Sequence, residues 1–240
     1  MKSKRITSLI AIFALVLSST IAFAQKTEDR KVASFESISL SIAAKVYVSQ
    51  NEKTSVKING YADDLDEIIT EVEGSTLKIK RKKNKGWNWN NRSFKKVEIY
   101  ISTPNVEDLR ISGSGNIIAK TPFQSGSVNY AISGSGNIII DKLKADNVEC
   151  HISGSGDIRL KGECQDELEI HISGSGDVEA GYFEAKSVDV RISGSGDCKV
   201  YASEKINARV AGSGDIYYRG NPEYVDSKSA GSGSIKSVRE

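Results

Sequence analysis

The hexapeptide ISGSGN at residues 111–116 recurs with little change through the C-terminal half of the chain. Six further copies follow, the last two degenerate, with first glycines at Gly134, Gly154, Gly174, Gly194, Gly212 and Gly231. Counted from Gly113, the spacings are 21, 20, 20, 20, 18 and 19 residues. A period of about 20 residues predicts a solenoid, in which each repeat buries its apolar side against its neighbours.

The residues before each repeated glycine alternate in polarity. Positions six, four and two before it are mostly apolar, and positions five and three before it are mostly polar or charged. The position two before the glycine holds Ile111, Ile132, Ile152, Ile172, Ile192, Val210 and Ser229. A period of two marks a strand with one buried face. The sequence therefore predicts an all-β fold, a single-stranded parallel β-helix (β-solenoid) with coils of about 20 residues. Inward-facing Ser227 and Ser229 mark the last copy as a polar cap.

Each Gly-Ser-Gly predicts a sharp corner between two strands, followed by a second strand and a looser return. We expect glycine at the corner because tight turns between strands require a positive φ, which costs other residues free energy. The Asn or Asp after the corner is expected to bond the local backbone as an Asx turn. One apolar residue in the return plugs the core, and these plugs are Phe123, Leu143, Cys164 and Phe183.

The outward positions form two columns of opposite sign. Stacked coils bring equivalent side chains to about 4.8 Å, where like charges repel by about 0.9 kcal/mol in water. Five residues before the glycine stand Asp108, Asn129, Glu149, Glu169, Asp189, Asn207 and Asp226. Three residues before it stand Arg110, Ala131, His151, His171, Arg191, Arg209 and Lys228. We expect these neighbouring columns to neutralise each other.

Residues 1–24 are typical of a secretory signal peptide. Basic residues and an apolar stretch precede the A-x-A sequence Ala22-Phe23-Ala24, so the mature chain should begin at Gln25. Removing three positive charges takes the formal net charge from +2 to −1, which argues against a global nucleic-acid binder. No other segment is apolar enough to span a bilayer, so we expect no membrane span after cleavage.

Residues 25–106 also carry strand patterns, at Ile38–Leu40, Ala44–Val48, Ser55–Ile58, Thr76–Lys80 and Val97–Ser102. The one helical pattern is a short segment of about three turns over Asp63–Val72, which Gly74 should end. No linker separates this region from the repeats of residues 107–240. We therefore expect it to continue the solenoid or to cap its start.

The repeated Gly-Ser-Gly, with F-x-x-I-S-L at Phe35–Leu40 and D-L-x-x-I at Asp64–Ile68, resembles the putative auto-transporter adhesin, head GIN domain family. The resemblance covers residues 32–235. It implies a β-helical fold, an exported location in bacteria and a suggested role in adhesion. It supplies no catalytic residues.

Two columns offer atoms that could bind a metal ion. Asp turns in Gly-rich β-rolls bind calcium, but at a period of nine residues, whereas each coil here offers one carboxylate. His151 and His171, beside Glu149 and Glu169, could hold zinc or copper. Because Arg and Lys fill most of the histidine column, we interpret both histidines as members of a basic column. The sequence predicts no metal ion and no cofactor.

The segment Lys78–Lys96 (KIKRKKNKGWNWNNRSFKK) holds nine basic residues and no acid. Its candidate ligand-binding residues are Lys82, Lys83, Trp87, Trp89 and Arg92. Basic residues among aromatic rings suit anionic glycans, lipopolysaccharide or nucleic acid. Export argues against nucleic acid. The alternative is a solvated hairpin whose two Trp side chains pack on their own sheet.

Three cysteines cannot all pair within one chain. Cys150 and Cys198 occupy columns otherwise filled mainly by aliphatic residues, and Cys164 is a plug. We therefore expect three buried thiols.

These features favour a non-catalytic exported protein of the periplasm or outer cell surface, with a long face for binding. Its partner would be an anionic glycan, an envelope component or a protein. A polysaccharide-active enzyme and a purely structural envelope component are the alternatives. Glycan cleavage requires carboxyl groups gathered in a groove. The charges here are spread along columns, and no position breaks the pattern to build a pocket, so we do not expect an enzyme.

Overall fold

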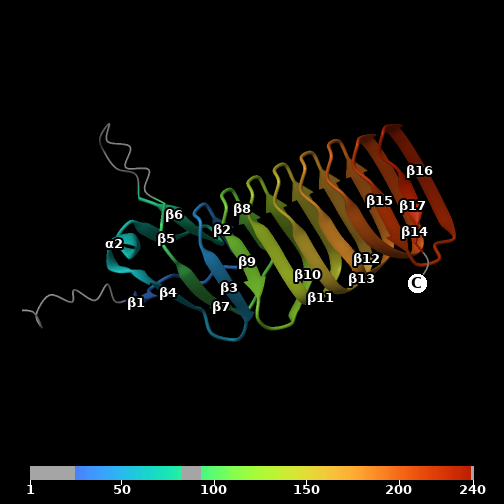
Figure 1. Cartoon of the computed structure of the whole chain (residues 1–240). Coiled ribbons are helices and arrows are strands. Elements are labelled where there is room, and N and C mark those ends of the chain that lie inside the picture. Colours follow the sequence, from blue (N-terminus) through green and yellow to red (C-terminus); the bar gives the residue numbers. More distant parts are fainter. Residues whose placement is uncertain (1–24, 83–92, 239–240) are drawn as a thin grey trace, which may run out of the picture.

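A computed structural model describes residues 25–82 and 93–238 of the 240-residue chain. The described part is mostly β-strand with almost no helix, and it is wound into coils that stack along one axis (Figure 1). The predicted parallel β-solenoid with coils of about 20 residues is confirmed. No helix among these residues is long and apolar enough to cross a membrane.

The repeat region pairs equivalent strands of successive coils in parallel and in register, as Ile172 pairs with Ile152 and Ile192. Its strands are β8 (Asp108–Ile111), β9 (Asn116–Ala119), β10 (Phe123–Ile132), β11 (Asn137–Ile152), β12 (Ile158–Ile172), β13 (Val178–Ile192), β14 (Cys198–Gly212), β15 (Ile216–Arg219), β16 (Tyr224–Gly231) and β17 (Ile235–Ser237).

Each coil has two long sides, which meet at the Gly-Ser-Gly corner. We call the stack of strands that lead into the corner the entry face; in the repeats it comprises β8, the C-terminal halves of β10–β14, and β16. The stack that leaves the corner is the exit face, formed by β9, the N-terminal halves of β11–β14, β15 and β17.

The core is a set of stacked apolar columns. Ile111, Ile132, Ile152, Ile172 and Ile192 are each at most 2% exposed. The predicted plugs Phe123, Leu143, Cys164 and Phe183 are also buried. Full burial of one aliphatic side chain contributes about 1.5–3 kcal/mol, so each added coil extends one continuous hydrophobic core.

The corner glycines serve a different purpose from the one predicted. Apart from Gly231, none of the corner glycines has a positive φ. A Cβ on Gly134 would instead lie 2.2 Å from the carbonyl oxygen of Gly113, in the preceding coil. Such contacts essentially never occur in real structures. Glycine is required because the corners stack backbone on backbone, so the expectation of positive φ was wrong.

The Asx column also differs from a local turn. The Oδ1 atom of Asp157 accepts a hydrogen bond from the backbone N–H of Asp177, one coil later, at 3.0 Å. The same bond recurs along the whole column: the backbone N–H of each residue donates to Oδ1 of the Asn or Asp one coil earlier. The residues, in order, are Asn116, Asn137, Asp157, Asp177, Asp197, Asp215 and Ser234. The column therefore links neighbouring coils and does not close Asx turns.

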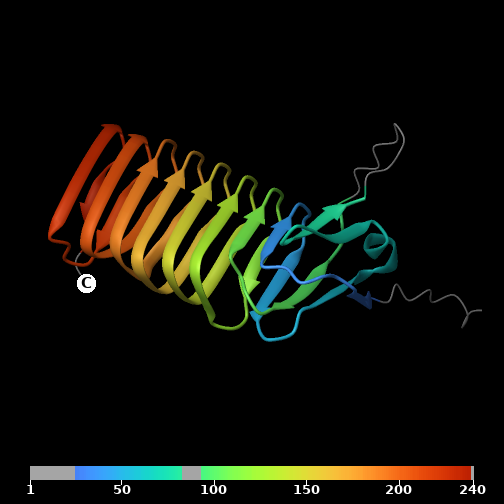
Figure 2. The same ribbon diagram turned by 180° about the vertical axis from the view of Figure 1, so that it is seen from behind.

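The N-terminal region is built from β1 (Gln25–Arg30), β2 (Ser37–Leu40), β3 (Lys45–Gln50), β4 (Ser55–Tyr61), α2 (Ala62–Leu65), β5 (Ile68–Glu73), β6 (Thr76–Arg81) and β7 (Glu98–Thr103). β2 pairs in parallel with both β6 and β8, and β3 pairs with both β7 and β9. The coil of β2 and β3 thus lies between two coils that come later in the sequence (Figure 1, Figure 2).

Antiparallel strands end the stack at this side. β5 pairs with β6 on the entry face, and β4 and then β1 extend β7 on the exit face. The region therefore both continues the solenoid and caps it. At the opposite end β16 pairs with β14, and its Ser227 and Ser229 are exposed.

The helix predicted over Asp63–Val72 is wrong beyond its first turn. Only Ala62–Leu65 is helical, and Ile68–Glu73 is a strand. β-branched Ile68, Ile69 and Val72 favour a strand. The two-residue turn at Gly74, which has a φ of +62°, folds this strand onto β6.

Candidate binding surfaces

The two charged columns of the entry face neutralise each other, as expected. Arg191 forms ion pairs with Asp189 at 3.1 Å and with Glu169 at 3.3 Å. Arg209 pairs with Asp226 at 2.5 Å. These side chains are at least one-third exposed apart from Asp189. Exposed pairs contribute little to stability, but they cancel the local field of each cation.

A groove runs along the entry face beside the corner, between the basic column and the serines that precede each corner glycine. Near the C-terminal end it encloses about 740 Å³, lined by residues that include Arg191, Ser193, Arg209 and Lys228. A shallower stretch of about 310 Å³ continues past His151 and Ser153. Two of the cations that line this groove, Arg191 and Arg209, are already paired with acids, which lowers the positive charge that the groove offers an anion.

The two histidines lie one coil apart, with ring centroids 5.1 Å from each other. Ligand atoms of Glu169, His171 and Asp189 lie within 4.8 Å of one another, as a metal site would require. The guanidinium of Arg191 lies among these three residues, with one nitrogen 2.9 Å from Nε2 of His171. A cation would have to displace this arginine, so the cluster works as an ion-pair network.

The basic segment proposed from the sequence lies mostly outside the described residues, since Lys83, Trp87, Trp89 and Arg92 belong to 83–92. Lys82 is exposed at the end of β6. Basic residues in the described flanks are paired with nearby acids. Lys78, Lys80, Arg81 and Lys96 pair with Glu73, Glu71, Glu67 and Glu98, respectively. The sequence alone therefore overstates the positive field of this segment.

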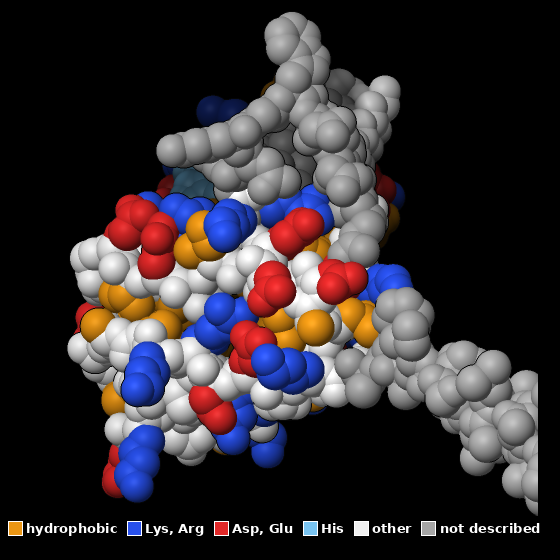
Figure 3. Space-filling model, turned by 90° about the vertical axis from the view of Figure 1, so that its left-hand side faces the viewer, with side chains coloured by type: hydrophobic (Ala, Val, Ile, Leu, Met, Phe, Trp, Pro, Cys, Tyr) orange, Lys and Arg blue, Asp and Glu red, His pale blue; other side chains and the backbone are white. Residues whose placement is uncertain are grey.

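The base of the segment is fixed to the N-terminal cap. The Arg81 guanidinium lies 4.1 Å from the centre of the Phe94 ring, and the Lys95 ammonium lies 4.7 Å from that of Tyr61. Fully buried Asp64 accepts a hydrogen bond from the backbone N–H of Lys95 at 3.1 Å. Seen end-on, the described surface of the cap mixes acidic and basic side chains (Figure 3).

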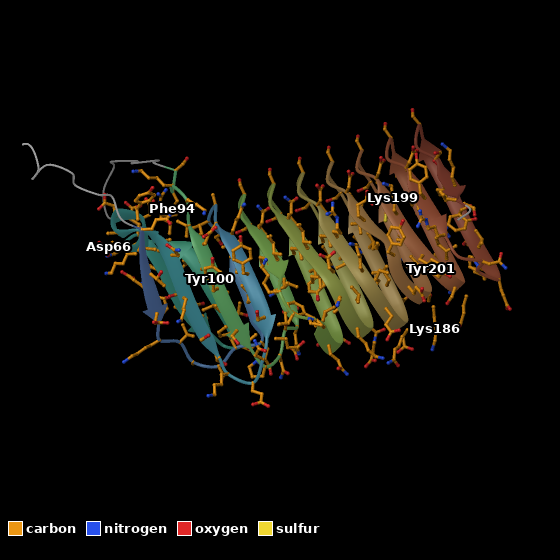
Figure 4. The ribbon with its side chains drawn as sticks, turned by 60° about the horizontal axis from the view of Figure 1, so that its bottom comes forward. Asp66, Phe94, Tyr100, Lys186, Lys199 and Tyr201 are labelled. Atoms are coloured by element: carbon orange, nitrogen blue, oxygen red, sulfur yellow. The ribbon has the colours of Figure 1, made fainter. Side chains whose placement is uncertain are left out.

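The exit face carries a hollow of about 640 Å³ that the sequence did not predict. Val238 and outward-facing residues of β12–β15 line it. The residues from these strands are Arg159, Lys161, Glu179, Gly181, Tyr182, Lys199, Tyr217 and Arg219. Figure 4 views this face, with Lys199 and Tyr201 labelled on β14 and Tyr100 towards the cap. Four of the lining residues are basic and one is acidic.

The hollow lies where the coil length changes. Ala180 pairs with Val200 and Glu184 with Tyr201, so the backbone of β13 bulges over residues 181–183. The 20-residue coil of β13 is therefore followed by a narrower 18-residue coil. The fall in glycine spacing from 20 to 18 residues could have indicated a pocket in the sequence. The expectation that no position breaks the pattern to build a pocket was wrong.

The three cysteines are free and buried. Burial raises the pKa of the Cys150 and Cys198 thiols well above the usual range, and it also raises the pKa of Cys164. A buried thiol with a raised pKa is a poor nucleophile, because the thiolate is the reactive form.

Comparisons with known proteins agree with this architecture. Residues 34–222 match the family described as putative auto-transporter adhesin, head GIN domain. A putative adhesin from Bacteroides fragilis is 29% identical, with a TM-score of 0.84 over 90% of this chain and 97% of its own. A putative lipid binding protein from Parabacteroides distasonis is 28% identical, with a TM-score of 0.71 over 90% and 98%. No curated protein matches the chain.

Proposed function

The chain belongs to the putative auto-transporter adhesin, head GIN domain family, and from that premise we propose that it is an exported, non-catalytic binding protein. Its partner is a surface glycan or another envelope component, held on one of the long outer faces of the solenoid. The periplasm or the outer cell surface is the place where such a partner is met.

One observation carries the non-catalytic part of the proposal. A general acid in glycan cleavage is a carboxyl group with a raised pKa beside a second carboxylate. Among the described carboxyl groups, the pKa values that depart from normal are all lowered, at Glu73, Asp215 and Asp226. Hydrogen bonds from Lys78, Ser234 and Arg209, respectively, are the largest causes. Their partners hold these three carboxyl groups in the charged form, which is not the form that a general acid needs.

Export is tested separately, by sequencing the N-terminus of the protein purified from the cells that produce it. The proposal expects Gln25 as the first residue and recovery from the periplasm or the outer surface. A chain that begins at Met1 and stays with the cytoplasmic fraction overturns the exported location.

Binding and turnover are tested together on a panel of polygalacturonate, heparin, dextran, lipopolysaccharide and phosphatidylglycerol vesicles. We expect retention on at least one saccharide or lipopolysaccharide, with no reducing ends released above the protein-free control. Release that grows with time and protein concentration supports the polysaccharide-active alternative and overturns the proposal. Retention on none of the panel also overturns it, whereas retention only on the vesicles supports a lipid of the envelope as the partner.

The basic segment with Trp87 and Trp89 is tested as the binding site on the same panel of ligands. Trp87→Ala/Trp89→Ala removes both indole rings of the basic segment. If this double variant loses the retention that the wild type shows, the ligand docks at the segment 83–92. If it keeps that retention, another face carries the binding.

A further inference from the structure

We propose that the hollow on the exit face is a binding site for an acidic saccharide, a chain that carries uronic acid groups. This inference rests on the proposed function and assigns its site and ligand class. The hollow has the volume, the charge and the aromatic surface that such a ligand needs, and each comes from different residues.

The shape arises from a bulge beside a shorter coil. In the β12–β13 pair Tyr182 lies opposite Lys161, and in the β13–β14 pair the backbone of β13 bulges between Ala180 and Glu184. The longer coil of β13 therefore projects as a ledge beyond the shorter coil of β14. Phe183 fixes the ledge because its ring is fully buried in the core. A hollow of about 640 Å³ is within the usual range for small-ligand sites, about 300–1,000 Å³.

Gly181 keeps the floor of the hollow open. Gly181 has no positive φ, and a Cβ there would meet only the Cβ of Lys199, at 3.7 Å, whereas a Cβ on a stacked corner glycine would collide with backbone. Neither backbone conformation nor stacking therefore requires a glycine at this position. What its missing side chain provides is space in the hollow that Gly181 lines, beside Lys199.

The hollow has an excess of positive charge. Lys199 pairs with Glu179 at 2.8 Å, and Lys161 pairs with Asp141 at 3.0 Å. Arg159 is exposed and forms no ion pair within the described part of the chain. Its guanidinium can therefore bind a ligand carboxylate with two parallel hydrogen bonds, without first breaking a protein ion pair. On the entry face, by contrast, Arg191 and Arg209 would have to leave acidic partners.

Tyr182 supplies the flat surface. Its side chain is 69% exposed, although large aromatic residues are usually buried. The Arg219 guanidinium lies 4.7 Å from the ring centre, a cation–π contact between two residues that both line the hollow. Tyr217 lines the same hollow from β15. An exposed aromatic ring beside cations fits a ligand with both apolar sugar faces and carboxylates, and a simple inorganic anion would make no use of the ring.

The test is calorimetric titration of the full chain with tetragalacturonic acid, with maltotetraose as the uncharged comparison. The wild type should bind the acidic saccharide and not the neutral one, with affinity that falls as salt screens the charges. Gly181→Val, which fills the floor, should lower the affinity by about tenfold or more. Arg159→Gln should lower it several-fold and weaken its salt dependence.

Gly126→Val is the matched control. Gly126 also lies in a return, has no positive φ, and would place its Cβ near only Asp146 Oδ2 at 3.7 Å. Gly126→Val should melt and bind like the wild type, whereas Gly181→Val should melt normally and bind poorly.

Equal affinities for these two variants overturn the inference, as does loss of binding in Trp87→Ala/Trp89→Ala alone. Equal binding of polyglutamate shows a site for any polyanion and overturns the saccharide assignment. If the wild type binds a different glycan but no acidic saccharide, the inference fails while the proposed function stands.

Discussion

Gly174 stacks so closely on Gly154 that a Cβ atom on Gly174 would lie 2.0 Å from the Gly154 carbonyl oxygen. The same relationship joins Gly176 to Gly156 and Gly194 to Gly174. Each corner is therefore a column of backbone in direct contact, and the repeat of glycine in the sequence follows from the stacking. Residues that line the faces can vary, but a side chain at these corners would push coils apart.

Gly174→Ala should therefore destabilise the chain by about 1–3 kcal/mol or more, because overpacking forces the backbone to shift. Gly181→Ala is the comparison, since its Cβ would have room and Gly-to-Ala changes at compatible positions are neutral or stabilising by about 0.4–1 kcal/mol. Urea unfolding of both variants measures the difference. Equal free energies of unfolding would contradict the stacking explanation.

Asp215 should make the stability of the C-terminal coils sensitive to acid. The Ser234 hydroxyl, the Ser234 N–H and the Tyr217 hydroxyl donate hydrogen bonds to it and lower its pKa below the ordinary 3.8. Because the folded pKa is the lower one, this stabilisation is complete above the unfolded value and is lost as pH falls through the folded value.

Asp215→Asn keeps an acceptor oxygen but no longer titrates. Its melting temperature should fall less steeply than that of the wild type below a pH of about 4. Thermal melts at a series of pH values measure both slopes. Parallel profiles for the two proteins would show that Asp215 does not contribute to the acid sensitivity.

Tyr130 carries a buried hydroxyl that finds no hydrogen-bond partner among the described residues. Burial raises the pKa of this phenol far above its usual range. Tyr130→Phe removes the unsatisfied hydroxyl and keeps the ring, so it should be neutral or stabilising by about 1–2 kcal/mol. Tyr130→Ala should instead cost about 3–5 kcal/mol, because it leaves a cavity. A clear loss of stability in Tyr130→Phe would mean that the hydroxyl has a partner.

The three cysteines should be inert in the folded protein. Cys150 and Cys198 are fully buried, and the thiol of Cys164 donates hydrogen bonds to the carbonyls of Asp146 at 3.0 Å and Glu167 at 3.1 Å. Ellman's reagent at pH 8 should label none of them rapidly in the native state and all three after unfolding without a reductant. Rapid labelling of any thiol in the native protein would contradict the burial of the cysteines. Labelling of fewer than three thiols after unfolding would contradict their free state.

The repeats made the solenoid predictable because one coil's pattern is copied along the chain. Period-two alternation fixed which face of each strand is buried, so Ile172 and its equivalents could be placed in the core from the sequence alone. The paired charges of Arg191, Asp189 and Glu169 followed from the same register. Features that follow from a local and repeated pattern of residues could therefore be predicted from the sequence.

The features that the sequence missed depend on contacts between distant residues. The coil of β2 and β3 lies between β6–β7 and β8–β9, an order that no local pattern encodes. Ile68–Glu73 is amphipathic as a helix, yet pairing with β6 makes it a strand. The hollow depends on a coil two residues shorter than its neighbour, and this step becomes visible only when the bulge at residues 181–183 is placed beside β14.

A crystal structure of the chain after long incubation with tetragalacturonic acid is the most direct test of a binding protein that performs no chemistry. The intact tetrasaccharide should lie in the exit-face hollow, with one sugar ring against Tyr182 and a carboxylate at Arg159. Shortened products in the crystal would mean that the protein cleaves its ligand. An empty hollow, with the saccharide on the entry face or at the N-terminal cap, would contradict the assignment of the site.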